Sequence, residues 1–379
     1  MECASGLVDA TVGYGHGAPV LRGVTLLTQP GEVLAVVGPS GSGKTTALRA
    51  VAGFERLRGG RALVAGRDVT AVTTPERDLA MVFQATTLVP FLDVAENMAM
   101  SVRARGTVTA EEADRRIDDR GRRLRLGRLL TRMPRTLSPG ENGLAGIGRA
   151  MVRVPSAFLL DEPLAHLDPP VRIRTRQTIV ALVRQLGAGA LYVTHDQSEA
   201  MAVGDRLAVL RDGVVVQVDR PRTVYECPAD VFVAGFLGEP AIALLPARLV
   251  TGGGDAGYRI GVRTLPLWGP APAGLRDGDP VLVGLRAEDV HEAGADADPA
   301  AVTLRAVVHG VEPHGHHSVL NARLQVAGEA DGARLAARLP SHSRLRPGDV
   351  AELVVDARRA HVFDPVTGRA LLHPTAPTP

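Results

Sequence analysis

The chain carries two patterns of apolar and polar positions, and the pattern changes near residue 238. Before that point, short apolar runs rich in β-branched residues are followed by longer segments with helical spacing. Strands are expected at 32–37 and 157–162, and helices at 46–52, 169–186 and 197–203. Strands that alternate with helices predict an α/β fold with a doubly wound parallel sheet. The pair Asp212-Gly213, between apolar runs at 207–210 and 214–218, predicts a β-hairpin.

An arginine-rich helical insertion is expected at 94–135. Leucines and acids are interspersed among its arginines, which predicts an amphipathic helix with a solvated face. Nucleic-acid binding is the alternative, but no aromatic residues accompany the charges to stack on bases. The cluster comprises Arg115, Arg116, Arg120, Arg122, Arg123, Arg125, Arg128, Arg132 and Arg135.

The pattern after residue 238 indicates a second domain. Short strand-like runs occur at 281–286, 302–309, 318–326 and 350–356, with turn-rich segments such as 269–272. Several short strands separated by turns are typical of a small all-β barrel. We therefore expect one domain at 1–238, with a helical part at about 90–150, and an OB-like domain at 239–379.

Composition and charge narrow the classes of function. The chain has 43 basic and 41 acidic residues, so it has no overall attraction to nucleic acid. No secretory leader is visible, and no apolar stretch approaches the roughly 18–20 residues that cross a bilayer. Two cysteines make no disulfide framework. We expect a cytoplasmic protein that reaches a membrane only through partners.

One basic residue stands apart, because Lys44 is the only lysine in the chain. Lysine offers a compact point charge where arginine offers a broad planar fork, so this position evidently needs the former. Lys44 lies in a complete G-x-x-x-x-G-K-[ST] motif between an expected strand and an expected helix, the context of a phosphate-binding loop. Its backbone N–H groups would hold phosphate oxygens, Lys44 would neutralise the β- and γ-phosphates, and Thr45 would bind Mg²⁺. The expected nucleotide-binding residues are Gly38, Pro39, Ser40, Gly41, Ser42, Gly43, Lys44, Thr45 and Thr46.

A second expected strand ends in the paired acids Asp161 and Glu162. At the carboxyl end of a parallel strand, both would face the nucleotide crevice. Asp161 would complete the Mg²⁺ shell and Glu162 would polarise the attacking water. The alternative is that the two acids only cap the following helix. The presence of a phosphate-binding loop favours the catalytic interpretation.

Further motifs along residues 7–238 resemble those of the ABC ATPases. Met81-Val82-Phe83-Gln84 is similar to the glutamine loop of that family, and Leu167-Asp168 to the loop that crosses its dimer interface. The segment 192–196 matches the switch histidine. The resemblance implies that Gln84 senses Mg²⁺ and a transmembrane partner, and that His195 contacts the γ-phosphate. It also implies that Tyr14 stacks on adenine, although an aromatic at a strand end can be purely structural.

The family signature is altered in this chain. Leu137-Ser138-Pro139-Gly140-Glu141 stands where the family usually has Leu-Ser-Gly-Gly-Gln. Ser138 suits a helix N-cap and Pro139 the first helical position, and Glu141 completes a capping box. In the family, Ser138 and Gly140 would face the γ-phosphate held by a second subunit. Proline removes one N–H donor there, and glutamate opposes the attraction of the helix end for phosphate. We expect ATP binding to be normal, with weakened closure and turnover.

The whole chain resembles the ATP-binding subunits of sugar and sn-glycerol-phosphate importers. Matching segments include 224–238, 284–290, 311–313 and 363–368. The resemblance implies a homodimer, or a matched pair, on the cytoplasmic face of the membrane. It would drive transmembrane permease subunits, with an extracytoplasmic solute-binding protein acting indirectly and no nucleic acid involved. Polyamine, iron and anion importers share this layout and stay open.

Two other classes of ABC protein are alternatives to the importer. ABC ATPases of translation or DNA repair commonly have two nucleotide sites or a long coiled coil, whereas this chain has one phosphate loop. A weakly catalytic regulatory subunit is favoured only by the altered signature. A metal site at His309, His314, His316 and His317 is disfavoured because the spacing fits no ordinary ligand set.

Overall fold

The computed structural model describes residues 5–15, 17–85, 88–103, 108–252, 256–293, 301–326, 328, 330–341 and 343–374. The chain forms two compact units, Met1–Pro221 and Arg222–Pro379. This division comes earlier along the chain than the boundary expected at residue 238.

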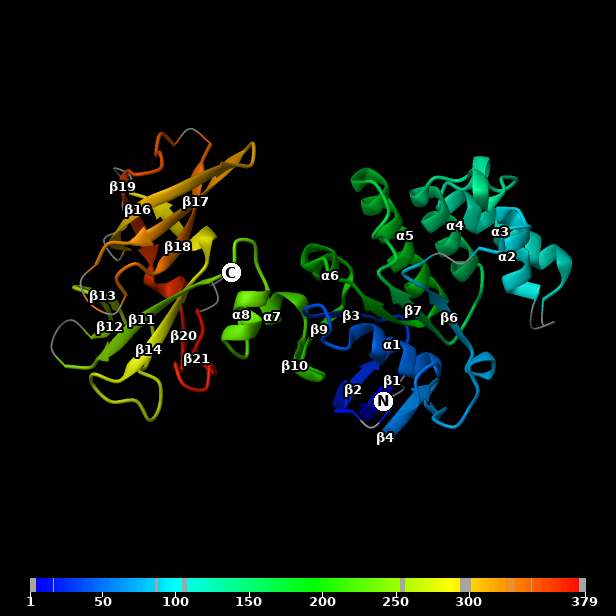
Figure 1. The fold of residues 1–379 in the computed structure, drawn as a ribbon, viewed down its shortest axis with the longest axis horizontal. Helices are drawn as coiled ribbons and strands as arrows, with labels where there is room; N and C mark the ends of the chain where they lie inside the picture. Colours follow the sequence, from blue (N-terminus) through cyan, green and yellow to red (C-terminus); the bar gives the residue numbers. More distant parts are fainter. Residues whose placement is uncertain are drawn as a thin grey trace. The chain divides into compact units, whose positions relative to one another are not determined.

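The first unit is built on a six-stranded sheet of order β10-β9-β3-β8-β7-β6 (Figure 1). Five strands are parallel, and β10 pairs antiparallel with β9 as the predicted hairpin. The expected parallel sheet is therefore confirmed. Its strands are β3 (Val33–Val37), β6 (Leu79–Val82), β7 (Ala157–Asp161), β8 (Gly189–Val193), β9 (Arg206–Arg211) and β10 (Val214–Asp219).

A four-stranded antiparallel sheet, which the sequence did not predict, completes the first unit. Helix α1 (Lys44–Ala52) packs between the two sheets, because Ala47, Leu48 and Val51 on it are fully buried in a core shared by both. Helices α5 (Pro169–Leu186) and α6 (Gln197–Val203) contact the parallel sheet at β8 and β3. The antiparallel strands are β1 (Ser5–Val12), β2 (Leu21–Thr28), β4 (Leu57–Val64) and β5 (Arg67–Asp68).

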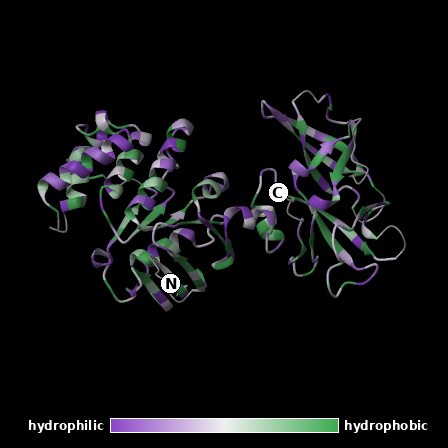
Figure 2. Ribbon diagram, turned by 180° about the vertical axis from the view of Figure 1, so that it is seen from behind, coloured by the Kyte–Doolittle hydropathy of each residue, from purple (hydrophilic) through white to green (hydrophobic). Residues whose placement is uncertain are grey.

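The predicted helical insertion consists of α2 (Val94–Arg103), α3 (Ala110–Arg123) and α4 (Pro139–Met151). Helix α3 is amphipathic as expected, with Ala113, Ile117 and Gly121 on its buried face. Hydrophilic residues run along this insertion, whereas the sheets of both units are rich in hydrophobic ones (Figure 2).

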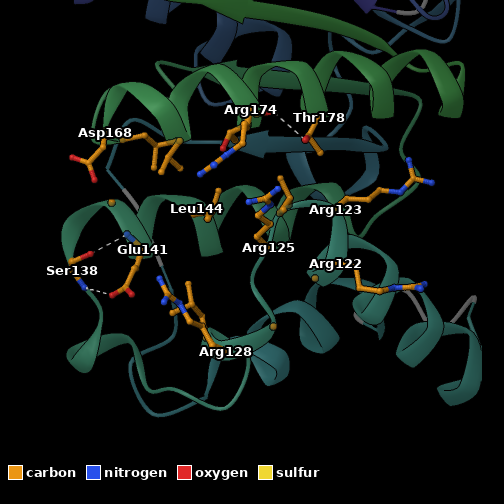
Figure 3. Close-up of a pocket in the computed structure, with 18 residues that line it drawn as sticks. Arg122, Arg123, Arg125, Arg128, Ser138, Glu141, Leu144, Asp168, Arg174 and Thr178 are labelled. Carbon is orange, nitrogen blue, oxygen red and sulfur yellow. Dashed lines mark hydrogen bonds between the residues drawn. The ribbon is translucent and has the colours of Figure 1, made fainter.

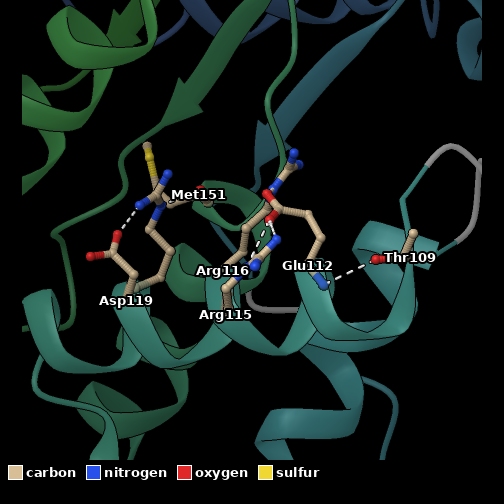
Figure 4. A network of polar contacts seen from close by, with 7 residues as sticks. Thr109, Glu112, Arg115, Arg116, Asp119 and Met151 are labelled. Atoms are coloured by element: carbon tan, nitrogen blue, oxygen red, sulfur yellow. Dashed lines mark hydrogen bonds and ion pairs between the residues drawn. The ribbon is translucent and has the colours of Figure 1, made fainter.

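The arginines of α3 do not all lie on a solvated face. Arg115 and Arg116 each pair with Glu112 at 2.7 Å, near the N-cap Thr109 (Figure 4). Arg120 is instead buried, and its Nε donates to the Met151 carbonyl at the end of α4 at 3.1 Å. The single-face expectation was wrong at Arg120, because an arginine can satisfy a backbone carbonyl inside the protein.

The second unit begins with two helices, α7 (Pro221–Glu226), most of which belongs to this unit, and α8 (Val231–Phe236). Its described residues after α8 are mainly β-strands, with short 3-10 helices at Ala287–Asp289 and Ala357–Arg359. The prediction of a small barrel-like β-domain is confirmed, with two sheets that enclose one apolar core. The first sheet contains β11 (Ala243–Val250), β12 (Gly257–Ile260), β13 (Arg263–Pro266), β14 (Pro280–Leu285), β20 (His361–Phe363) and β21 (Ala370–Leu372). The second contains β15 (Val290–Glu292), β16 (Ala301–Pro313), β17 (His317–Leu324), β18 (Arg334–Pro340) and β19 (Val350–Asp356).

Arg286 explains why the second unit begins before residue 238. Its guanidinium lies 3.6 Å from the centre of the Tyr225 ring and donates to the carbonyls of Tyr225 and Leu237, both at 2.7 Å. Arg286 follows β14 and is buried, so it ties the segment of α7 and α8 to the β-domain.

No described helix is both long enough and apolar enough to span a bilayer.

Candidate active site

The loop between β3 and α1 has the geometry that its glycines require. Gly43 is the N-cap of α1 and has φ 103°, in the left-handed region that favours glycine. A Cβ at Gly38 would stand 2.1 Å from the Leu210 carbonyl oxygen, so only glycine fits there. The loop thus leads directly into the N-terminus of a buried helix, which favours a bound anion.

Lys44 is held over this loop by its own backbone. Its Nζ donates to the carbonyl oxygens of Gly38 at 2.8 Å and Pro39 at 2.9 Å. Burial lowers the pKa of Lys44, while the charges of Glu162 and Asp161 act to raise it. The ammonium therefore lies in a partly desolvated pocket beside two acids.

Asp161 ends β7 beside the start of α1. Its Oδ1 accepts from the Thr45 hydroxyl at 3.2 Å, and only 3% of the residue is exposed. Burial raises the pKa of Asp161, and the charge of Glu162 adds to the rise. A buried carboxylate beside a hydroxyl offers hard oxygen ligands and would gain from a cation. These two residues therefore fit a magnesium ion.

Glu162 brings together the ends of three parallel strands. Its Oε2 lies 3.1 Å from Gln84 Nε2, after β6, and 3.1 Å from His195 Nδ1, after β8. Its backbone has φ 46°, which is strained for a residue with a side chain, and its N–H donates to Val193 O at 2.9 Å. Strain of this kind is typical of functional positions.

These residues surround a cavity of about 570 Å³. Its dimensions suit a ligand larger than phosphate alone. Of the expected site residues, it is lined by Ser40, Gly41, Gly43, Lys44, Thr45, Thr46, Gln84, Glu162 and His195, together with Val20.

Eight of the expected site residues do not line this cavity. Gly38, Pro39 and Ser42 belong to the phosphate loop, and Asp161 accepts from Thr45, which does line the cavity. Tyr14 is 52% exposed. Ser138, Gly140 and Asp168 line a different cavity of about 840 Å³ in the same unit (Figure 3). A single chain therefore does not bring these last three to its own phosphate loop.

Helix α4 begins as the sequence predicts. Ser138 is the N-cap, Pro139 occupies the first turn and Glu141 forms the capping box with Ser138. The Glu141 carboxylate also lies 3.2 Å from Arg132, which the sequence did not indicate. The hydrogen bond from the Ser138 backbone, with the charge of Arg132, holds the pKa of Glu141 below its usual range.

The loop of His195 rests on a buried network that sequence reasoning missed. The Tyr192 hydroxyl donates to Glu199 of α6, and the Glu199 N–H donates to Asp196 Oδ1 at 2.8 Å. Arg172 of α5 lies 3.6 Å from Asp196 and so links this loop to the helix that follows Asp168. The spacing of Tyr192 and Glu199 across a strand and a helix gave no local signal.

The far end of α1 is fixed by Arg77, another residue without a sequence signal. Its NH1 donates to the carbonyls of Ala50 at 3.0 Å and Val51 at 2.8 Å. A Cβ at Gly53 would stand 2.7 Å from its guanidinium carbon. A buried cation thus caps the C-terminus of the helix whose N-terminus adjoins the phosphate loop.

Two family models match the chain. One, described as ABC transporter, covers residues 21–165, and the other, described as TOBE domain, covers residues 283–363.

Three relatives match over nearly the full length of both proteins. The chain is 42% identical over 359 residues to an sn-glycerol-3-phosphate import ATP-binding protein of Cereibacter sphaeroides, covering 94% of this chain and 96% of the relative. It is 39% identical to a diacetylchitobiose uptake system ATP-binding protein of Streptomyces coelicolor, with the same coverage. It is 38% identical to a trehalose/maltose import ATP-binding protein of Thermococcus litoralis, covering 96% and 98%.

A solved structure is similar to part of the chain. The dimeric post-hydrolysis state of an ATP-binding cassette bound to ADP and Pi has a TM-score of 0.53 and 27% identity, and it covers 57% of this chain and 99% of its own.

The buried network beneath His195 yields a stability prediction. Tyr192→Phe removes the donor to Glu199, and loss of one partner of a buried polar pair costs about 1–3 kcal/mol of unfolding free energy. Glu199→Gln is the control, because an amide can still accept from Tyr192 without a buried charge. Urea unfolding of the full chain measures both, and a Tyr192→Phe protein as stable as the parent would contradict the network.

The same pair predicts a pH dependence. Burial raises the pKa of Glu199 above its usual 4.5, so the folded state holds this proton more tightly than the unfolded state. The stability that Glu199 contributes is present below pH 4.5 and is lost as the pH rises through the raised pKa. As the pH rises from 4.5 through the raised pKa, the unfolding free energy of the Glu199→Gln protein should therefore increase relative to that of the parent.

Proposed function

The chain belongs to the ATP-binding subunits of ABC importers, which hydrolyse ATP, and on that premise we propose how its residues bind and cleave the nucleotide. The observation that carries the proposal is the convergence of Lys44, Glu162, Gln84 and His195 around the 570 Å³ cavity, with Asp161 bonded to Thr45 beside them.

The phosphate loop would bind the triphosphate. Its N–H groups and the start of α1 supply fixed positive potential, and Lys44 would exchange its two carbonyl acceptors for the β- and γ-phosphate oxygens. The exposed ring of Tyr14 is available to stack on adenine.

Thr45 and Asp161 would hold Mg²⁺, with Gln84 as a third oxygen donor. The ion supplies charge neutralisation at the β- and γ-phosphates when it is bound. The raised pKa of Asp161 supports this assignment, because a cation would favour the ionised carboxylate.

Glu162 would act as the general base. Water attacks the γ-phosphorus, the bond to the β-phosphate oxygen breaks, and the Glu162 carboxylate accepts the proton from water. Gln84 and His195 both lie 3.1 Å from Glu162 Oε2, so they fix its orientation. His195 would also contact the γ-phosphate, whose charge it helps to stabilise.

A second copy of the chain would complete the site. Ser138, Gly140 and Asp168 line a cavity apart from the phosphate loop, so in one chain they do not serve its nucleotide. A symmetric dimer would place them against the partner's nucleotide, and the dimeric cassette among the structural neighbours supports this arrangement.

Permease subunits at the cytoplasmic face of the membrane are the proposed partners, with a solute-binding protein outside. The helical part α2–α4 would contact the permease. The full-length relatives import sn-glycerol-3-phosphate, diacetylchitobiose and trehalose or maltose. We therefore propose a carbohydrate or glycerol-phosphate compound as the solute.

Two substitutions separate binding from hydrolysis. Lys44→Ala should abolish ATP binding, because it removes the cation from the phosphates. Glu162→Gln should retain binding and lose about 10²–10⁴-fold in hydrolysis rate. A fluorescent ATP analogue measures affinity and phosphate release measures turnover. If the Lys44→Ala protein bound ATP as tightly as the parent, the assignment of the phosphate loop as the nucleotide site would be wrong.

Restoring the usual signature residues tests whether the altered signature lowers the ATPase rate. The double variant Pro139→Gly with Glu141→Gln should raise the steady-state ATPase rate and leave ATP affinity of the isolated chain unchanged. It restores an N–H donor and removes a carboxylate near the incoming phosphates. Equal rates in parent and variant would show that the Glu141–Arg132 pair already offsets the charge.

Solute choice is tested with the whole transporter. The permease that is recovered with the chain is reconstituted in vesicles together with the chain and the binding protein. These vesicles should accumulate a carbohydrate or a glycerol-phosphate only when ATP is supplied. ATP-dependent accumulation of a polyamine or a metal instead would refute the solute class and leave the ATPase assignment intact.

A further inference from the structure

The segment that carries Tyr14 connects β1 to β2 and is closed at its base. The N–H of Val20 donates to the Val12 carbonyl at 2.7 Å, so the two ends of the segment meet. Val20 also lines the 570 Å³ cavity beside the phosphate loop. The segment therefore starts from the rim of the proposed nucleotide site, and its conformation determines where the Tyr14 ring lies.

Glycines surround Tyr14 and give this segment conformational freedom. They occupy positions 13, 15 and 17. Gly15 has φ 53°, in the left-handed region, and a Cβ there would meet no atom within 4 Å. Glycine loses more backbone entropy on ordering than any other residue. A contact from outside the segment would therefore help to hold the ring in one place before a nucleotide binds.

Arg58 of β4 supplies such a contact. Its Nη2 donates to the Gly15 carbonyl at 2.6 Å and its Nη1 to the Gly17 carbonyl at 3.1 Å. A Cβ at Gly13 would stand 2.6 Å from the Arg58 guanidinium carbon, so the guanidinium lies directly against the backbone there. Its rigid plane of N–H donors thus holds the backbone on both sides of Tyr14.

A β-bulge directs the Arg58 side chain. Strand β1 pairs with β4, with Thr11 opposite Gly59 and Val12 opposite Leu57, so Arg58 is the extra residue on β4. A bulge of this kind re-aims a side chain and is over-represented next to active sites. Because the bulge lies at the end of β1, it faces the point where the glycine-rich segment begins.

We propose that Arg58 is a positioning residue for the adenine base. It fixes the glycine-rich segment so that the exposed Tyr14 ring is in place before ATP binds. The proposal rests on the stacking role proposed above for Tyr14. Ordering the segment in advance raises affinity, because the nucleotide then does not have to offset the entropy of ordering it. The effect is confined to ligands that carry a base, since the phosphate loop binds the triphosphate.

Isothermal titration of the full chain compares a non-hydrolysable ATP analogue with inorganic triphosphate, which has no base. Arg58→Gln should weaken binding of the ATP analogue about five-fold, because the segment must then be ordered when the nucleotide binds. Binding of inorganic triphosphate should be unchanged, whereas a variant that merely disturbed the fold would weaken both. The control Arg61→Gln removes an exposed arginine from the same strand and should bind both ligands like the parent.

Tyr14→Ala separates this proposal from the one on which it rests. If Tyr14 stacks on adenine, Tyr14→Ala weakens binding of the ATP analogue. Adding Arg58→Gln to that variant should then weaken binding no further, because no ring is left to position. Steady-state hydrolysis gives a second readout, in which Arg58→Gln should raise the KM for ATP and leave kcat unchanged.

Two outcomes overturn the role of Arg58 and leave that of Tyr14 intact. One is an Arg58→Gln protein that binds the ATP analogue as tightly as the parent. The other is an equal loss of affinity for the ATP analogue and for inorganic triphosphate. A Tyr14→Ala protein with unchanged affinity for the analogue would instead refute base stacking, and with it the action of Arg58 through the ring.

Discussion

The candidate active site depends on placing one ammonium and two carboxylates together in a largely buried pocket. Lys44 begins α1, whereas Asp161 and Glu162 stand at the end of β7. The attraction between the ammonium and the two acids offsets only part of the cost of burying Lys44 and Asp161. The part of this burial cost that stays uncompensated favours the binding of a ligand with anionic oxygens, together with a metal cation. The parallel sheet makes this possible, because β6, β7 and β8 all end at the same edge.

The residues that line the 570 Å³ cavity were largely predictable because each motif is local. The phosphate loop, the paired acids and the switch histidine each lie within a few residues of a recognisable strand or helix, and the sheet brings nine expected residues to one cavity. The capping box of α4 was equally predictable, since its two partners are three residues apart. The placement of Ser138 and Asp168 in another cavity could not be inferred, because a local pattern carries no information about distance to a remote loop.

The supporting residues were not predictable, and the reason is the excess of arginine. Arg77, Arg120 and Arg286 are buried and donate to backbone carbonyls far away in the sequence. In a chain where nearly every cation is arginine, nothing distinguishes these three from exposed ones. The same excess concealed Arg132, whose contact with Glu141 changes the electrostatics expected of the signature helix. A buried arginine satisfies several carbonyls at once, which lysine does with less fixed geometry.

The anchoring of α7 and α8 by Arg286 has a practical consequence for dissecting the protein. A fragment cut at residue 238 would retain both helices while losing the guanidinium that satisfies the carbonyls of Tyr225 and Leu237. Its tail would carry unpaired polar groups and an uncovered tyrosine face, a combination that invites proteolysis and self-association. A fragment boundary near residue 221 keeps the stacked Tyr225 and Arg286 in the same fragment.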